Sequence, residues 1–378
     1  MTPIRYDVIV VGGGSAGLMA GVAAAEAGAR TLLVDKGDKL GRKLGISGGG
    51  RCNVTNNKEP EELIKHIPGN GRFLYSALTA FGSREIIRFF EGLGIKLKEE
   101  DRGRMFPVSD KAKTVVDALV GRVRALGVEI RTNAPVAEVL YEHRRAAGIR
   151  LRSGEILRAR AVVVATGGKS VPHTGSTGDG YAWAEAAGHT ITELYPTEVP
   201  ITSDEPFIRD RSLQGLSLRD IELTVHDPKG KRVVTHDGDM IFTHFGISGP
   251  AALRASQFVV KTKKAFGVEN VLLTVDLHPG ENGEALRRRL EDIARAEPKK
   301  AAKNVFRPLA PERLLPLLLR RAGIQPDAPA GSLSRASLGA LAGVLKRFEL
   351  RASGTLPLED AFVTGGGVCL KEIDPKTM

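Results

Sequence analysis

The chain begins with two short apolar runs separated by an alanine-rich stretch. The runs YDVIVV (6–11) and RTLLVD (30–35) are continuous, as in strands buried on both faces of a parallel sheet. Between them, SAGLMAGVAAAEAGA (15–29) favours a helix, and Gly28 is placed to end it. The pattern therefore predicts a strand–helix–strand unit of about thirty residues.

The pattern changes after this unit. Apolar periodicity predicts helices at 72–92 and 111–126, and the segments that follow predict short strands separated by Ser-Gly and basic turns. The last of these strands, RAVVVATGG (160–168), is expected to be buried and to end in glycines. From about 196, alternating polar and apolar residues predict antiparallel strands with a turn at DPKG.

A helical pattern then covers 283 to about 348, and DAFVTGGGV (360–368) predicts one more strand. The expected fold class is α/β, with a Rossmann-like dinucleotide-binding domain and β-meander interrupted by a β-rich insertion and a helical domain. The expected domains are 1–195 (nucleotide-binding, first part), 196–282 (β-rich substrate domain), 283–350 (helical) and 351–378 (return to the nucleotide-binding domain).

Composition adds one unusual feature, the glycine content. Of 378 residues, 44 are Gly, which is well above an average usage of about 7%. The glycines cluster near 12–17, 41–50, 165–180 and 365–367. This clustering indicates loops that a ligand approaches closely rather than a low-complexity segment.

Charge and hydropathy narrow the classes of function. The net charge of +11 suits an anionic cofactor or substrate and leaves weak nucleic-acid binding open, but interspersed acids favour a solvated surface over a nucleic-acid partner. No apolar run reaches the ~18–20 residues of a membrane span, and the first strand leaves no room for a signal peptide. We therefore expect a cytoplasmic protein. Two cysteines, Cys52 and Cys369, are too few for a disulfide framework or a metal cluster.

The segment VIVVGGGSAGLMAG carries the first functional signal. Gly12, Gly14 and Gly17 form G-x-G-x-x-G directly after a strand and at the start of a helix. They permit a tight turn, the approach of a pyrophosphate and close packing of helix on strand, respectively. The N–H groups of the helix start, which includes Ser15 and Ala16, are then expected to face the phosphates.

An acid at the end of the second strand supports the same prediction. Asp35 lies eighteen residues after Gly17, where a carboxylate can bind the hydroxyls of a ribose, and we assign the adjacent Lys36 to the same site. Strand, helix and spaced acid together predict dinucleotide binding.

The later strands distinguish FAD from NAD. A nicotinamide-binding Rossmann domain continues with further strand–helix units, whereas here a run of short strands ends in VVVATGG. This arrangement resembles the flavoproteins related to glutathione reductase and fumarate reductase. The resemblance implies FAD, with Thr166, Gly167 and Gly168 close to it and the backbone of Val136 beside the adenine.

The stretch KLGRKLGISGGGRCNVTNN (39–57) combines five glycines with four cations just after Asp35. We expect it to run along the dinucleotide, with cations balancing anionic charge and bare N–H groups facing the flavin or its phosphates. The residues assigned to these contacts are Arg42, Lys43, Ser47, Gly48, Gly49, Gly50, Arg51 and Asn53. Cys52 is either a redox-active thiol near the flavin or a small residue in a crowded loop, and we favour the second.

The same stretch carries a more specific resemblance. GRKLGISGGGRCNVTN is similar to the signature of the aminoacetone-oxidase and BaiN-like family of NAD(P)/FAD-dependent oxidoreductases. Two further segments, GGKSVPHTGSTGDGYAWAEAAGH (167–189) and MIFTHFGISGPAALRAS (240–256), agree with that family, so the similarity covers essentially the whole chain. It implies a FAD domain, an inserted β-rich domain and a helical domain, whereas substrates across the family are mostly unassigned.

One departure from such flavoproteins concerns the C-terminal region. They continue past the TGGGV run, in which we assign Gly366 to the cofactor site, with a segment rich in Gly, Asp and Glu that contacts the flavin. This chain stops at Met378, before that segment, and we expect it to be a truncated form.

Several polar residues keep two interpretations. Asp179 either caps a helix or lies over the flavin, as the resemblance suggests. The helix expected to begin at Pro250 either binds an anionic substrate or merely begins there. His173 and His244 have the pKa range for acid–base chemistry, but we favour a surface or packing role for each.

We therefore expect a FAD-dependent oxidoreductase that transfers hydride between the flavin and a small molecule or NAD(P)H. A second G-x-G-x-x-G after a strand is missing from the sequence, so NAD(P)H would bind transiently in a reductase, or oxygen would accept electrons in an oxidase. The alternatives are an RNA-modifying flavoprotein and a non-enzymatic dinucleotide-binding protein. The sequence assigns no catalytic residue and no oligomeric state.

Overall fold

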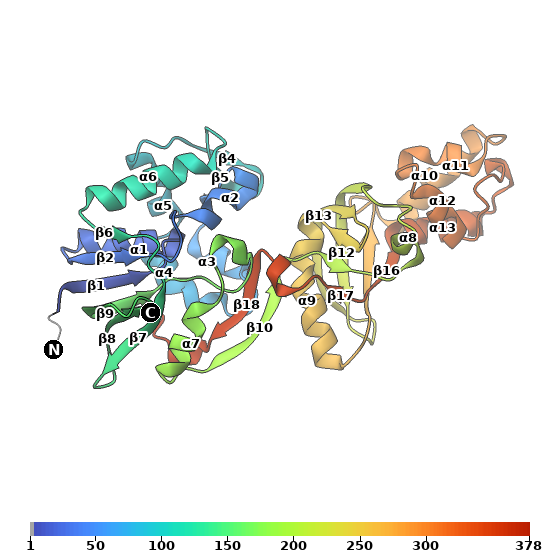
Figure 1. The fold of residues 1–378 in the computed structure, drawn as a ribbon. Coiled ribbons are helices and arrows are strands. Elements are labelled where there is room, and N and C mark those ends of the chain that lie inside the picture. Colours follow the sequence, from blue (N-terminus) through green and yellow to red (C-terminus); the bar gives the residue numbers. More distant parts are fainter. Residues whose placement is uncertain (1–3) are drawn as a thin grey trace. The chain divides into compact units, whose positions relative to one another are not determined.

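The computed structural model describes residues 4–378 (Figure 1). The chain forms two compact units: unit 1 contains Met1–Glu193 and Gly366–Met378, and unit 2 contains Leu194–Gly365. The expected α/β class is confirmed, with a parallel sheet in unit 1 and an antiparallel sheet in unit 2. The domain boundaries expected from the sequence stay predictions. Throughout residues 4–378, each helix is too short or too polar to cross a bilayer.

Unit 1 is built on a six-stranded sheet in the order β6-β2-β1-β9-β8-β7. The first four of these strands are parallel, and β8 and β7 continue from β9 as an antiparallel meander. The bounds are Tyr6–Val11 (β1), Thr31–Val34 (β2), Glu129–Arg131 (β6), Val136–Glu142 (β7), Arg145–Leu151 (β8) and Ile156–Val164 (β9). The two apolar runs at the N-terminus thus form the central strands, as predicted.

Alternate residues of β1 and β2 point to opposite faces of this sheet. One face packs on α1 (Ser15–Glu26) and α6 (Ala112–Ala125), which bury Leu18 and Val123. The other face packs on α7 (Asp179–Ala186), whose Trp183 is buried among residues of the meander. The Trp183 indole N–H donates to the Ala137 carbonyl at 3.0 Å, which fixes α7 on β7.

The segment between β2 and β6 forms a helical excursion with a small sheet in the order β3-β5-β4. Its elements are α2 (Arg42–Gly50), β3 (Thr55–Asn56), α3 (Pro60–Leu63), α4 (Tyr75–Ala80), α5 (Ser83–Gly92), β4 (Leu97–Glu100) and β5 (Arg104–Pro107). The helical pattern predicted at 72–92 forms two helices, because the chain breaks between α4 and α5. Gly82 is the N-cap of α5, and its N–H donates to the Glu85 carboxylate at 3.0 Å, as in a capping box.

Unit 2 contains a seven-stranded antiparallel sheet in the order β16-β15-β12-β13-β14-β11-β17. The bounds are Ile201–Thr202 (β11), Ser217–His226 (β12), Arg232–Phe242 (β13), Gly246–Ser248 (β14), Val271–Asp276 (β15), Phe348–Ala352 (β16) and Gly354–Thr355 (β17). The hairpin β12–β13 turns at DPKG, as predicted. The long helix α9 (Pro250–Phe266) packs on the sheet through fully buried Ala252, Ala255 and Val259.

A helical excursion leaves this sheet between β15 and β16, which pair directly with each other. It contains α10 (Gly283–Ala296), α11 (Ala302–Val305), α12 (Leu315–Arg321) and α13 (Arg335–Lys346), and the short α8 (Pro206–Arg209) lies earlier in unit 2. The helices bury leucines, among them Leu290, Leu318 and Leu341, in one continuous core with the sheet. The chain passes between the units at β10 (Ile191–Thr197) and β18 (Val363–Val368), which pair as a two-stranded ribbon.

The C-terminal half of β9 has an open edge. β9 pairs with β8 only through Ile156–Arg158, whereas β1 pairs with it as far as Val164. Beyond Arg158, the described residues of β9 pair with β1 alone. The expectation that the run RAVVVATGG is buried is therefore wrong at Val163 and Val164, which are 36% and 45% exposed.

Candidate functional site

The glycine-rich turn between β1 and α1 has one crowded, one open and one closely packed position. A Cβ on Gly12 (φ +108°) would lie 2.5 Å from the carbonyl oxygen of Ala165, in the segment that follows β9. A Cβ on Gly17 would lie 1.7 Å from the carbonyl oxygen of Gly12, so helix and turn are in direct contact. A Cβ on Gly14 would meet nothing within 4 Å. The turn thus leaves free space only above Gly14, where the motif places a pyrophosphate.

The start of α1 is uncapped. Gly14 is the N-cap, no side chain bonds to the helix start, and its first turn contains no acidic residue within the part of the chain described. The first four N–H groups of a helix have no intrahelical acceptor, so those from Gly14 through Ser15 and Ala16 to Gly17 are offered to a ligand. Together with the positive end of the helix dipole, they fit the phosphates of a dinucleotide.

Asp35 lies at the end of β2 and holds two backbone segments. Its carboxylate accepts the N–H of Gly13 at 2.6 Å and that of Gly37 at 2.7 Å. Each carboxylate oxygen still has a second lone pair for a ribose hydroxyl. The side chain also lines a cavity of about 370 Å³ together with Pro172 and His173. The ribose contact stays a prediction, and the structure adds a role in shaping the turn.

Lys36 joins the strand end to the segment before α7. Its ammonium group donates to the Asp179 carboxylate at 2.6 Å and also to the Thr177 hydroxyl, which itself donates to Asp179 at 2.9 Å. Gly178 is the N-cap of α7, so Asp179 is the first helical residue and not the cap. Partial burial raises the pKa of Asp179, but the hydrogen bonds from Lys36 and Thr177 outweigh it and hold the pKa below its usual value.

Lys36→Met is therefore expected to lower the free energy of unfolding by about 1 kcal/mol at pH 7, the upper range for a partly exposed pair. A carboxyl with a depressed folded pKa stabilises above its ordinary value of 3.8, and the effect is lost as pH falls through the folded pKa. The difference from wild type should thus shrink only below about pH 4 in urea unfolding series. The control is Lys39→Met, an exposed lysine; an equal loss in both variants would contradict the pairing.

The glycine-rich stretch after Asp35 is a short helix followed by a left-handed turn. Ser47 leaves the helical conformation, and Gly48, Gly49 and Gly50 follow at φ +57°, +68° and +85°. A Cβ at Gly48 would crowd Asn53 at 2.8 Å, whereas at Gly49 and Gly50 it would meet nothing within 4 Å. The last two glycines therefore present open backbone, as expected for a ligand-facing turn.

The cations of this stretch are held by protein groups. Arg42 pairs with Asp38, and Lys43 donates to the Ser170 carbonyl at 2.8 Å. Burial lowers the pKa of Lys43. The predicted contacts of both cations with the cofactor stay predictions; Arg42 lines the same cavity as Asp35.

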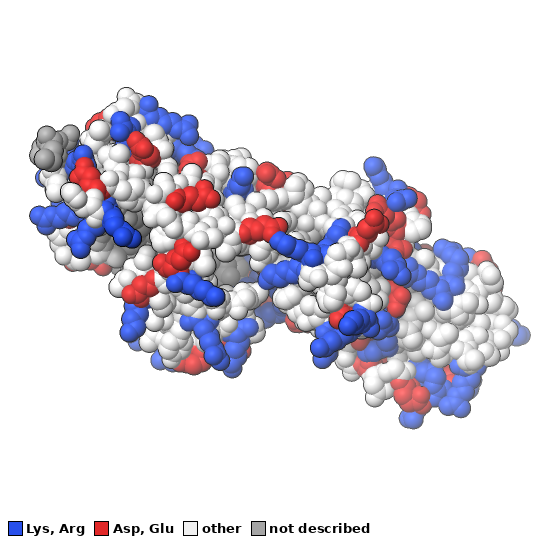
Figure 2. Space-filling view, turned by 90° about the horizontal axis from the view of Figure 1, so that it is seen from below, with Lys and Arg blue, Asp and Glu red and all other residues white. Residues whose placement is uncertain are grey.

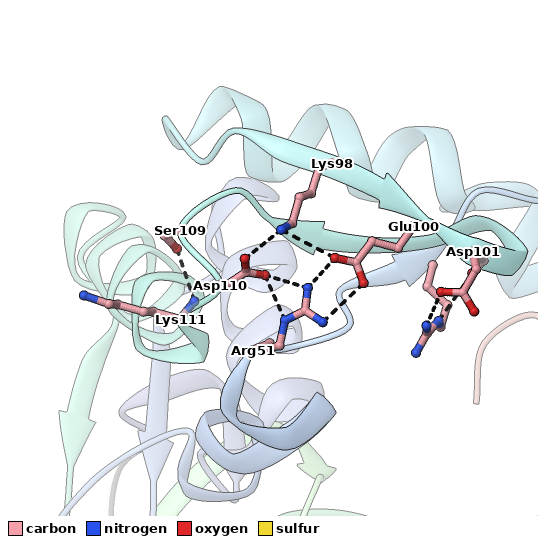
Figure 3. A network of polar contacts seen from close by, with 8 residues as sticks. Arg51, Lys98, Glu100, Asp101, Ser109, Asp110 and Lys111 are labelled. Carbon is pink, nitrogen blue, oxygen red and sulfur yellow. Dashed lines mark hydrogen bonds and ion pairs between the residues drawn. The ribbon is translucent and has the colours of Figure 1, made fainter. Parts of the chain in front are cut away.

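Arg51 lies in a network with acidic residues of the small sheet (Figure 3). Its guanidinium donates to Asp110 at 2.6 and 2.8 Å and to Glu100 at 3.2 Å, and Lys98 bridges both acids. The guanidinium also lies 4.3 Å from the ring centre of Phe106. Hydrogen bonds from Arg51 lower the pKa of Glu100, and those from Lys98 and Arg51 lower that of Asp110. The network fixes the chain directly after the glycine turn.

The next two residues, Cys52 and Asn53, make contacts with nearby parts of the protein. Cys52 is fully buried at φ +64°, and burial raises the pKa of its thiol despite a hydrogen bond with Ser47. A buried thiol with a raised pKa is a poor nucleophile, which supports the small-residue interpretation. The Asn53 amide is placed to donate to the carbonyl oxygens of Thr55 at 2.8 Å and Met105 at 3.3 Å.

The remaining predicted residues fall in several places. Thr166 and Gly167 (φ +75°) follow β9 beside the turn at Gly12, with Gly168 next to them. Val136 begins β7 and is buried, and Gly366 (φ +79°) lies in β18. In unit 2, His244 packs on Phe245 with ring centres 4.8 Å apart, and α9 begins at Pro250 as expected.

Some polar residues near the cavity escaped the sequence-based prediction. Thr177 and Asn133 both line the cavity beside Asp35, and Asn133 (φ +51°) donates its N–H to the Gly37 carbonyl at 2.8 Å. Thr177 stands in the GSTGDG segment that the family resemblance singled out, which was the available signal. Asn133 precedes an Ala-Pro turn and gives no comparable signal.

Comparisons with known proteins identify the family of the chain. The family model described as HI0933-like protein Rossmann domain matches residues 6–378. The ribosomal RNA dihydrouridine synthase of Escherichia coli (strain K12) is 32% identical over 377 residues, covering 99% of this chain and 88% of that protein. The 3-dehydro-bile acid delta(4,6)-reductase of Clostridium scindens is 28% identical over 374 residues, covering 98% and 88%. A flavocytochrome c3 fumarate reductase structure matches at a TM-score of 0.45 with 17% identity, covering 95% of this chain and 72% of that one.

The match over 6–378 and the 32% identity across almost the whole chain confirm the resemblance drawn from the sequence. They also confirm that the chain belongs to a class of flavin-dependent enzymes, which implies FAD as the cofactor. The open, uncapped turn at Gly14 fits that cofactor. The chain belongs to the HI0933-like family of FAD-dependent oxidoreductases.

Proposed function

We propose that this chain is a FAD-dependent reductase that adds hydrogen across a carbon–carbon double bond conjugated with a carbonyl group. The observation that carries the cofactor part is the turn at Gly14, where an uncapped helix start faces open space. Phosphates fit this position, because no side chain competes for the N–H groups.

The reaction class is supported by the names of the relatives that match over most of their length. A dihydrouridine synthase makes dihydrouridine, which carries two more hydrogens than uridine. A delta(4,6)-reductase reduces ring double bonds. Both names describe hydrogenation of a ring, although the two substrates differ in size and charge. The shared chemistry therefore transfers more safely than either substrate.

The chain's own residues would hold the cofactor and shape its surroundings. The turn at Gly12–Gly17 and Asp35 would hold the pyrophosphate and ribose, and Gly49 and Gly50 present open backbone further along. A bound flavin supplies the hydride chemistry. No second G-x-G-x-x-G follows a strand in the described chain, so NAD(P)H would bind only transiently as the electron donor. Donor hydride and a solvent proton would together saturate the double bond.

A second candidate concerns the substrate, which we propose to be a uracil ring within RNA. The supporting observation is the distribution of charge: residues 283–347 contain 14 Lys and Arg against six Asp and Glu, a net +8 of the chain's +11. The sequence-based view of evenly spread charge missed this concentration. Phosphate backbones attract such segments.

The test is an anaerobic titration of the purified chain, loaded with FAD, with NADPH and then with an acceptor. Bleaching of the visible flavin spectrum by NADPH, and its return on adding transcribed ribosomal RNA or a conjugated steroid enone, is the expected result. Mass spectrometry of the acceptor should show two added hydrogens. If only oxygen reoxidises the flavin and neither acceptor is reduced, the protein is an oxidase and the proposal is wrong.

A further inference from the structure

We propose that the helical excursion of unit 2, residues 283–347, together with the outer face of β16, is a docking surface for an RNA phosphate backbone. Its anchor is a cavity of about 450 Å³ whose charged lining consists of three arginines and two glutamates: Arg321, Arg347, Arg351, Glu205 and Glu349. The inference rests on the RNA form of the proposed function and assigns that partner to a surface of unit 2.

Charge is the first supporting observation. The excursion contributes +8 to the net charge, and outside it the chain is nearly balanced. In the view of Figure 2, blue Lys and Arg side chains outnumber red carboxylates around the rim of the helical end. Most of these cations pair with exposed carboxylates, for example Lys303 with Asp327 and Lys300 with Glu297. Exposed pairs contribute little, so phosphates can replace the carboxylates at low cost.

Three cations of this region are engaged neither in ion pairs nor in side-chain hydrogen bonds among the described residues. They are Lys299 after α10, Arg320 on α12 and Arg351 on β16. All three are exposed. They are therefore free to meet phosphate groups without first breaking an existing bond.

The cavity is the second observation, and the strand pattern explains its charge. In β16, Phe348, Leu350 and Ala352 are buried, so Glu349 and Arg351 point outward. β16 is an edge strand, and the end of α13 brings Arg347 to the same cavity. Arg347 donates to the Glu349 carboxylate at 3.0 Å, and both side chains are about half exposed.

Arg321 is held in a fixed position within this cavity. Its guanidinium lies 4.5 Å from the ring centre of Phe348, and it donates to the Glu349 carbonyl oxygen. Burial lowers its pKa, although the nearby Glu205 and Glu349 act in the opposite direction. Glu205 accepts the Arg351 backbone N–H at 3.0 Å and lies 3.8 Å from the Arg321 guanidinium, whereas the Arg351 side chain is in no ion pair among the described residues. A preorganised guanidinium beside a free one suits bidentate binding of phosphate oxygens.

The test compares two triple variants of the full chain with equal loss of charge. Arg347→Gln and Arg351→Gln remove two cations of the cavity, and Arg320→Gln removes an exposed cation of α12 in the same excursion. The control Lys229→Gln, Lys231→Gln and Arg232→Gln removes exposed cations at the β12–β13 turn of the same unit. Affinity for a fluorescent, transcribed ribosomal RNA fragment is measured by anisotropy between 50 and 200 mM salt, after circular dichroism shows both variants folded.

The cavity variant is expected to bind RNA at least about tenfold more weakly, and the slope of log K against log salt should fall by about 2 to 3 for three lost phosphate contacts. The control should change affinity less than about twofold. Equal losses in both variants, or displacement of the RNA by polyglutamate at matched charge, would overturn the assignment.

The same preparation separates this inference from the proposed function. Flavin reduction by NADPH and reduction of a small enone do not depend on RNA docking. A wild-type chain that reduces the enone but binds no RNA at 50 mM salt removes the docking surface and leaves the reductase intact. RNA binding through the cavity without reduction of any acceptor keeps the surface and removes the reductase.

Discussion

Gly14→Val is expected to abolish flavin binding while the protein without cofactor stays folded. The position has ordinary extended geometry (φ −76°, ψ −174°), and a Cβ there would meet no protein atom within 4 Å. Valine tolerates extended backbone, and loss of a glycine N-cap costs at most about 1 kcal/mol. Its methyl groups would, however, fill the space into which the pyrophosphate must come. We expect affinity for FAD to fall by at least about 100-fold, or about 2.7 kcal/mol.

Fluorescence titration with FAD measures this loss, and thermal unfolding without FAD measures the fold. The matched control is Gly121→Val in α6, where a Cβ also meets open space but lies on the exposed side of the helix. Full retention of flavin by Gly14→Val would show that the phosphates bind elsewhere. Unfolding of the cofactor-free variant would contradict the open space seen above Gly14.

Gly17→Ala, unlike Gly14→Val, is expected to lower the free energy of unfolding strongly even without cofactor. The new Cβ would lie 1.7 Å from the Gly12 carbonyl oxygen and 2.9 Å from its carbon, which are backbone atoms that cannot rotate away. Helix α1 would have to move off β1, and with it Leu18 and Val22, which are buried against the sheet. Overpacking of this kind costs about 3 kcal/mol.

Gly21→Ala, one turn later in the same helix, is the control. Its Cβ would lie 3.7 Å from Leu33 and 4.0 Å from Val123, which is ordinary contact. Alanine in a helix gains about 1 kcal/mol over glycine, so this variant should be more stable than wild type. Urea unfolding of the two variants should therefore differ by about 4 kcal/mol. Equal stability would mean that α1 has room to shift.

The parts of the fold that the sequence predicted are those with a local signal. The strand–helix–strand unit was predicted because apolar runs, glycines and the acid at Asp35 all lie within thirty-five residues. The FAD assignment needed the strands before Thr166 and the family resemblance as well. The β12–β13 hairpin was predicted from its DPKG turn, and the start of α9 from Pro250.

The missed features depend on residues far apart in the chain. The sequence did not predict the pairing of Arg51 with Glu100 and Asp110, which lie 49 and 59 residues later, and its contact with the cofactor stays a prediction. Lys36 and Asp179 meet across 143 residues. Apolar periodicity does not record such pairings, because they depend on which loops the sheet brings together. The exposure of Val163 was missed for the same reason, since a buried pattern does not say whether a neighbour covers it.

The open edge of β9 has a practical consequence for work with this protein. Half of the peptide groups beyond Arg158 direct their N–H and C=O away from β1, and Val163 and Val164 beside them are accessible. Such a strand is a template on which an extended segment of another molecule can assemble. Concentrated preparations are therefore expected to associate through that edge, and an added β-forming peptide that occupies the edge is expected to keep the protein in solution.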